Sequence, residues 1–235
     1  MPTVTWARLD GSRRRAVLAA AEEEFAAHGF SGGSLNVIAR RAGVAKGSLF
    51  QYFADKRDLY AYVTDQASQR VRAYMETQID ALDPRRPFFD FLTDLLDAWV
   101  AYFADNPRER ALHAAASFEV ETDARVSVRA VVHRHYLDVL RPLVRDAQNR
   151  GDLRADADTA TLLSLLLMIL PHLALAPYVR GLDPLLGMDE LSPEQPTLAV
   201  RRFVAVLSAA FSPAYSPSPS QPTTAVPTTG GHTHV

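Results

Sequence analysis

The chain has 235 residues, 48% of them hydrophobic, which is enough for one large or two small domains and excludes wholesale disorder. The absence of cysteine excludes disulfides and thiolate chemistry, and the polar first twelve residues lack the apolar core of a secretory signal, so we expect a cytoplasmic protein. The net charge of −2 is uneven: residues 1–60 carry nine Lys/Arg and six Asp/Glu, which favours an anionic partner at this end, although chance explains such an excess too.

The first predicted helix follows residues 1–11, which we expect to form a flexible arm. Ser12 is a candidate N-cap, and Val17 and Phe25 share an apolar face with the helical period. Gly29 is the predicted end of this helix.

Residues 34–53, SLNVIARRAGVAKGSLFQYF, have the pattern of a helix-turn-helix. Ser34 can cap one short helix, Gly43 supplies the turn, and a second short helix begins near Ala45. Its apolar residues Leu49 and Phe53 face inward, whereas small and polar residues remain outside. The alternative is a structural helical hairpin without any function in DNA binding.

The remainder is also predicted to be helical, with no strand-like alternation. Asp55 caps a long helix that ends near Leu82. The fold class is therefore all-α: an N-terminal three-helix helix-turn-helix domain (1–56), then a second helical domain (57–211), with about nine helices, and a disordered Pro/Ser/Thr-rich tail (212–235). The further predicted helices span 87–104, 107–119, 122–150, a segment from 158, and 197–211.

Residues 160–179 contain no charge, and two interpretations remain open. The length suits a bilayer span, but Pro171 and Pro177 interrupt the segment. A helix that is apolar all round also fits one buried between its own domain and a partner. We favour this second interpretation, with the last helix as the other half of a homodimer interface formed by Leu163, Leu165, Leu166, Leu167, Leu170, Phe203, Val204 and Leu207.

About fifty residues of the N-terminal part resemble the DNA-binding domain of TetR-type transcriptional regulators. The resemblance is carried by Gly29-Phe30, Ser34, Ile38-Ala39, Ala42-Gly43-Val44, Gly47, Leu49, Tyr52-Phe53 and Lys56. Two positions depart from the family pattern, since Ala45 replaces the usual Ser and Phe50 the usual Tyr. Each loss removes a possible hydrogen bond to DNA.

The resemblance implies a homodimer that binds a palindromic double-stranded DNA operator, most often as a repressor that a ligand releases. Base edges and phosphates are then contacted by the exposed start of the second short helix and by nearby cations and hydroxyls. The predicted DNA-binding residues are Arg13, Ser34, Ala45, Lys46, Gly47, Ser48, Phe50, Gln51, Tyr52 and Lys56.

The resemblance implies that the helical domain (57–211) is the ligand-binding and dimerisation domain. Its apolar wall favours a hydrophobic effector, either a lipid or acyl molecule or an aromatic drug-like compound. The predicted wall consists of Phe89, Leu92, Leu96, Trp99, Phe103, His113, Phe118, His135 and Tyr136. No cofactor or metal site is expected, because His133 and His135 point apart on a helix and cysteine is absent. An all-helical enzyme with an unmarked site, a regulator that requires a co-repressor, and an activator remain alternatives. A repressor would be cytoplasmic and associated with the nucleoid.

Overall fold

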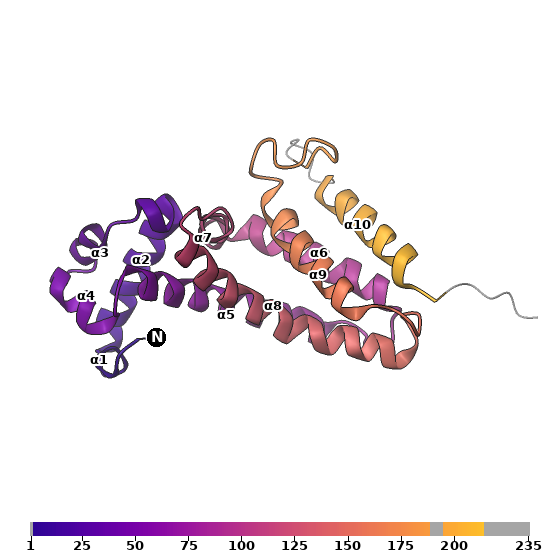
Figure 1. Ribbon diagram of the computed structural model, residues 1–235, viewed down its shortest axis with the longest axis horizontal. Helices are drawn as coiled ribbons and strands as arrows, with labels where there is room; N and C mark the ends of the chain where they lie inside the picture. The colour runs from indigo at the N-terminus through magenta and orange to yellow at the C-terminus, as the bar shows by residue number, and fades with distance from the viewer. Residues whose placement is uncertain (1, 189–194, 214–235) are drawn as a thin grey trace, which may run out of the picture.

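The computed structural model describes residues 2–188 and 195–213, and this part of the chain forms ten α-helices and no strand. The predicted all-α fold is therefore confirmed. Figure 1 shows an elongated molecule with a small N-terminal head and a larger helical body. The expected tail at 212–235 lies outside the described residues, except for its first two positions.

The segment expected to be a flexible arm contacts the helix-turn-helix where the structure describes it. It contains a short helix, α1 (Val4–Ala7), which buries Trp6 to 2% exposure. The indole packs on Phe53 with ring centroids 4.9 Å apart, and the backbone N–H of Thr3 donates to the carbonyl of Tyr52 at 2.9 Å. An aromatic side chain of this segment therefore covers the end of the helix-turn-helix.

Helix α2 (Gly11–Gly32) begins two residues earlier than predicted. Asp10, not Ser12, caps it, since its carboxylate accepts from the backbone N–H groups of Ser12 and Arg13 at 2.9 and 3.2 Å. Gly29 interrupts the helix as predicted, because its φ of 63° is a conformation that favours glycine.

The helix-turn-helix follows with the predicted elements. Helix α3 (Leu35–Arg41) is capped by Ser34, and α4 (Lys46–Tyr52) follows a turn in which Gly43 has a φ of 66°. Figure 1 places α3 and α4 at the outer end of the head, with α2 between them and the body.

Helix α5 (Lys56–Ala81), capped by Asp55, leads from the head into the body. Five helices complete the body, close to the predicted ranges. They are α6 (Phe88–Asp105), α7 (Pro107–Ser117), α8 (Thr122–Arg150), α9 (Thr159–Leu175) and α10 (Gln195–Phe211).

The buried apolar residues form two clusters. One fills the body, and the other fills the head but also includes Leu112 and Ala116 of α7 and Ala124 and Val128 of α8. The head therefore shares its core with the first part of the body. In the part of the chain that the structure describes, no helix combines the length and the hydropathy needed to cross a bilayer.

Candidate DNA-binding surface and effector cavity

The exposed side of α4 carries most of the predicted DNA contacts. Lys46, Gly47 and Gln51 are exposed, and Phe50 is 49% exposed. A Cβ placed at Gly47 would meet nothing within 4 Å, so this side of the helix is open. The N-cap Ala45 makes no side-chain hydrogen bond, as its lack of a hydroxyl requires.

Tyr52 differs from the rest of the predicted set. Its side chain is 5% exposed and packs on Trp6, with ring centroids 5.6 Å apart. The residue lies on the inner side of α4, so its visible contribution is to position the helix.

Two further predicted contacts lie at helix starts in the head. Arg13 is exposed in the first turn of α2. Ser34 is half-buried; its hydroxyl caps α3 by accepting from the Val37 N–H at 3.5 Å, and its own N–H donates to Glu24 at 3.0 Å. The cap leaves the Ser34 oxygen engaged with the backbone.

Lys56 already has partners inside the protein. Its ammonium lies 4.6 Å from the centroid of the Phe30 ring and donates to the carbonyl of Ser31 at 3.4 Å. Partial burial lowers the pKa of Lys56, whereas the carboxylates of Glu119 and Glu24 oppose that shift. This lysine links α5 to the end of α2 whether or not it also contacts a phosphate.

A buried carboxylate joins the head to the body. Glu119, in the link between α7 and α8, accepts from the Phe30 N–H at 3.0 Å, the Ser31 hydroxyl at 2.9 Å and the Glu121 N–H at 3.0 Å. Burial opposes its ionisation, but the hydrogen bonds outweigh burial and hold the pKa of Glu119 below its ordinary value. Lys56 supplies a nearby positive charge.

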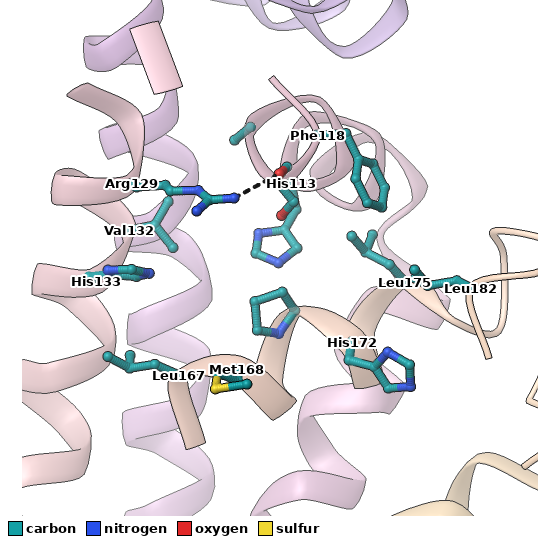
Figure 2. Close-up of a pocket in the computed structure, with 13 residues that line it drawn as sticks. His113, Phe118, Arg129, Val132, His133, Leu167, Met168, His172, Leu175 and Leu182 are labelled. Atoms are coloured by element: carbon teal, nitrogen blue, oxygen red, sulfur yellow. Dashed lines mark hydrogen bonds between the residues drawn. The ribbon is translucent and has the colours of Figure 1, made fainter. Parts of the chain in front are cut away.

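A well-lined cavity lies between α7, α8, α9 and the segment that follows α9. Its volume is about 440 Å³, and Figure 2 shows Arg129 and His133 on the α8 side, opposite Phe118 and Leu175. Met168 and Phe118 are 71% and 50% exposed, so they belong to its outer part. The full lining is His113, Ala116, Ser117, Phe118, Arg129, Val132, His133, Leu167, Met168, Pro171, His172, Leu175 and Leu182.

The predicted ligand wall is divided between this cavity and two smaller ones. His113 and Phe118 line the large cavity. Two cavities of about 40 and 20 Å³ lie deeper in the body, and together their walls include Leu92, Leu96, Trp99, Phe103, His113, His135 and Tyr136. Phe89 lines none of the three and packs in the apolar core against Phe88, with ring centroids 5.1 Å apart.

His113 connects the large cavity to the deeper aromatic cluster. Its ring lies 5.0 Å from that of Phe103 and 6.2 Å from that of Trp99, and its Nε2 is 3.4 Å from the Tyr136 hydroxyl. The surrounding apolar groups lower the pKa of His113 to about 4, because burial disfavours the charged imidazolium. The same burial raises the pKa of Tyr136 well above its ordinary value.

His135, unlike His113, contacts a carboxylate, that of Asp65. Its Nε2 lies 2.8 Å from Asp65 Oδ1 on α5, while its buried Nδ1 has no hydrogen-bond partner among the described atoms. The residue thus ties α8 to α5 at the wall of the deeper apolar cavity.

The residues predicted for the dimer interface fall into two groups. Leu166, Leu170, Val204 and Leu207 are at most 5% exposed within their own chain and belong to the body core. They are already covered by that core, because α9 and α10 both pack on α6. Leu163, Leu165, Leu167 and Phe203 are half-buried and remain partly accessible.

Several functional candidates were missed from the sequence. Arg129 and His133 were not selected for the pocket, although they sit one turn apart on α8 and face the same cavity. That spacing was the available signal. No sequence signal indicated Met168 or Leu182, because their position depends on how α9 and the following segment fold over α7 and α8.

Comparisons with known proteins agree with this geometry. Residues 17–63 match the family described as bacterial regulatory proteins, tetR family. The chain is 25% identical over 155 residues to the HTH-type transcriptional regulator UidR of Escherichia coli, which covers 66% of this chain and 76% of UidR. It is 32% identical over 120 residues to the HTH-type transcriptional activator FasR of Mycolicibacterium smegmatis, covering 48% of this chain and 54% of FasR.

The fold has solved counterparts. The transcriptional regulator FadR of Bacillus subtilis, solved in complex with stearoyl-CoA, has a TM-score of 0.65 at 15% identity, over 83% of this chain and 98% of that one. Residues 17–63, which match the tetR family, include the helix-turn-helix and its exposed helix α4. These residues therefore belong to the tetR family of bacterial regulatory proteins, and the whole chain has the fold of TetR-family transcriptional regulators.

Proposed function

We propose that this regulator is a repressor that binds a palindromic operator as a homodimer and is released by a hydrophobic small molecule. The observation that supports the DNA contact most directly is the exposed side of α4, where Lys46, Gly47 and Gln51 stand free of the protein's own core. A lysine at the helix start suits phosphate, and a glutamine amide suits a base edge.

The effector site would be the cavity of about 440 Å³, whose size falls in the range of about 300–1,000 Å³ typical of small-molecule sites. Leu167, Met168 and Leu175 give it an apolar lining. The similar fold of FadR, which holds stearoyl-CoA, adds support for a lipid-like or acyl effector.

The link between α7 and α8 would transmit occupancy of the cavity to the DNA-binding head. Phe118 lines the cavity, and the next residue, Glu119, holds the backbone of Phe30 and the hydroxyl of Ser31 at the end of α2. A ligand that displaces Phe118 therefore pulls on the contact that fixes the head. Such a ligand acts only through its different affinity for the two head positions.

Dimerisation would use the sides of α9 and α10 that their own core leaves open. On α9 these residues are Thr161, Ser164, Leu165 and Met168, which follow helical spacing. On α10 they include Leu198 and Val206, which are 42% and 69% exposed. The two recognition helices must then stand about 34–36 Å apart to enter successive major grooves.

Selection of binding sites from a random-sequence DNA pool tests this function. The purified full-length protein should enrich an inverted repeat whose half-site centres are separated by about 10–10.5 base pairs or a multiple of that spacing. Enrichment of a single half-site would overturn the dimeric repressor, and no enrichment would overturn specific binding by α4.

A further inference from the structure

The large cavity has a cationic group in an otherwise mostly apolar lining. Arg129 projects from α8 toward the end of α7, where its Nη2 donates to the carbonyl of Ser117 at 3.3 Å, as the dashed line in Figure 2 shows. That carbonyl is neutral and Arg129 is exposed, so the guanidinium is free to meet a charged group. Among the described residues that line the cavity, none carries a carboxylate.

Three other arginines of α8 lie beside carboxylates, whereas Arg125 and Arg141 resemble Arg129 in forming no ion pair among the described residues. Arg134 lies 2.6 Å from Asp65, and Arg145 lies 3.7 Å from Asp146. Within residues 2–188 and 195–213, no ion pair is formed by Arg129. His133, one turn further along α8, has its pKa lowered by burial and by the charge of Arg129. Arg129 thus gives the outer wall a positive charge, and none of the described lining residues carries a negative one.

The inner end of the cavity is uncharged. His113 is neutral at physiological pH because its pKa is about 4, and behind it stand Trp99, Phe103 and Tyr136. His113 and Val132 also line the small deeper cavity, so the same wall separates the two spaces. An apolar group loses no hydrogen bonds by moving toward this end.

We infer that the cavity binds an amphipathic anion, with its charged head at Arg129 and its apolar chain directed inward past Leu167 toward His113. This inference rests on the proposed effector site and specifies the chemical class of its ligand. An anionic head forms a charge-assisted hydrogen bond with the guanidinium, and a carboxylate can engage it in a bidentate manner. A neutral apolar ligand would not form this charge-assisted hydrogen bond.

His172 does not contribute to this head-group site. Its Nε2 lies 2.8 Å from Asp183, and Figure 2 shows its ring turned away from Arg129. Asp183 in turn accepts from the backbone N–H groups of Leu185 and Leu186 at 3.0 and 2.8 Å. The pair holds the segment after α9 over the cavity and leaves Arg129 as the group that selects charge.

Brominated dodecanoates provide a direct probe of the orientation, because bromine quenches only nearby tryptophans. The chain has two, and Trp6 belongs to the core of the head whereas Trp99 belongs to that of the body. In full-length Trp6→Phe protein, dodecanoate brominated at its terminal carbon should quench Trp99 more than dodecanoate brominated beside the carboxylate. The wild-type protein gives the same comparison if Trp6→Phe fails to fold.

The charge requirement is tested with dodecanoate and dodecanol, measured by calorimetry on the wild type and on Arg129→Gln. The substitution should weaken dodecanoate binding about tenfold or more, as expected for a lost hydrogen bond between charged groups, and leave dodecanol binding unchanged. Arg145→Gln is the matched control, because it removes the same charge from a 72% exposed position on the same helix, outside the cavity lining. It should change neither affinity.

The outcomes test three claims separately: the charge of the ligand's head group, the orientation of the ligand and the DNA-binding function. Equal binding of dodecanol and dodecanoate, unaffected by Arg129→Gln, would overturn the anionic class. Stronger quenching by the bromine next to the carboxylate would overturn the orientation. If neither probe binds while the same preparation still selects a DNA sequence, the ligand class is wrong and the DNA-binding function stands. Failure to select any DNA sequence counts against the proposed function instead.

Discussion

The carboxylate of Glu119 accepts a hydrogen bond from the backbone N–H of Phe30 at 3.0 Å, across 89 positions of the chain. This contact connects the link between α7 and α8, next to the cavity, with the end of α2 in the DNA-binding head. Glu119 also accepts hydrogen bonds from the Ser31 hydroxyl and the Glu121 N–H, so one carboxylate satisfies three donors.

Glu119→Ala should therefore destabilise the folded protein markedly. The substitution leaves the N–H groups of Phe30 and Glu121 without partners, and a buried donor left unsatisfied costs about 1–3 kcal/mol. We expect the free energy of unfolding, measured with urea, to fall by about 2–4 kcal/mol. Glu23→Ala is the control: Glu23 is 60% exposed with a 3.5 Å contact to Arg41, so a change of comparable size there would refute the special role of Glu119.

The same carboxylate should show its effect as a dependence of stability on pH. The pKa of Glu119 is held below 4.5 in the folded protein, so its contribution is complete above that pH and is lost as the pH falls through the lower folded pKa. The difference in unfolding free energy between wild type and Glu119→Gln should shrink in strongly acidic solution. A difference that grows on acidification would contradict the assigned direction.

His113 gives a second pH effect, at higher pH. Its folded pKa is about 4 against an ordinary 6.5, so the unfolded chain binds a proton that the folded protein excludes. Stability should fall as the pH decreases from 6.5 toward 4, and His113→Gln should lose this part of the slope. Urea titrations at several pH values measure it, and identical slopes in the two proteins would show that His113 is not buried as described.

Lys46 and Lys56 should respond differently to replacement by alanine. Lys46 is exposed at the start of α4, so Lys46→Ala should reduce the salt dependence of DNA binding by about one unit of slope and leave stability unchanged. Lys56→Ala also removes the contacts to Phe30 and Ser31 and should lower stability. Arg85→Ala, at an 88% exposed position in the body, is the control. An unchanged slope would exclude the substituted lysine from the DNA interface.

An aspartate at Leu165 or Val206 should dissociate the dimer. Leu165 is half-buried and Val206 is 69% exposed, so neither change opens the body core, whereas both place a charge on the proposed interface. Size-exclusion chromatography with light scattering should show monomers. Val126→Asp, at a 62% exposed position on α8, should remain dimeric. A dimer that survives both substitutions would place the interface elsewhere.

The helices could be predicted because their signals are local. Asp55, Asn106-Pro107 and Asp158 mark helix starts, Gly43 marks the turn, and the apolar spacing defines the buried sides. The spaced residues of the helix-turn-helix likewise lie within one short segment, so the exposed side of α4 follows from the sequence. The burial of Tyr52 against Trp6 does not follow from the sequence, because it depends on a contact between distant residues.

The effector cavity could be predicted only in part, because its walls come from segments far apart in the chain. Aromatic residues at helical spacing, such as Trp99 and Tyr136, proved to be packed closely around small deeper cavities. The larger space opens where α9 and the segment after it meet α7 and α8, and this geometry depends on packing. Leu166 and Leu207 illustrate the same limit, since apolar spacing alone does not distinguish a residue buried in its own core from one buried by a partner.

Genomic footprinting with the purified full-length protein at near-physiological salt tests the central claim most directly. A specific dimeric regulator should protect one or a few inverted repeats, and Lys46→Ala should weaken that protection without altering the fold. Protection spread evenly over all DNA, or protection that Lys46→Ala leaves unchanged, would contradict the assignment of α4 as the element that recognises the operator.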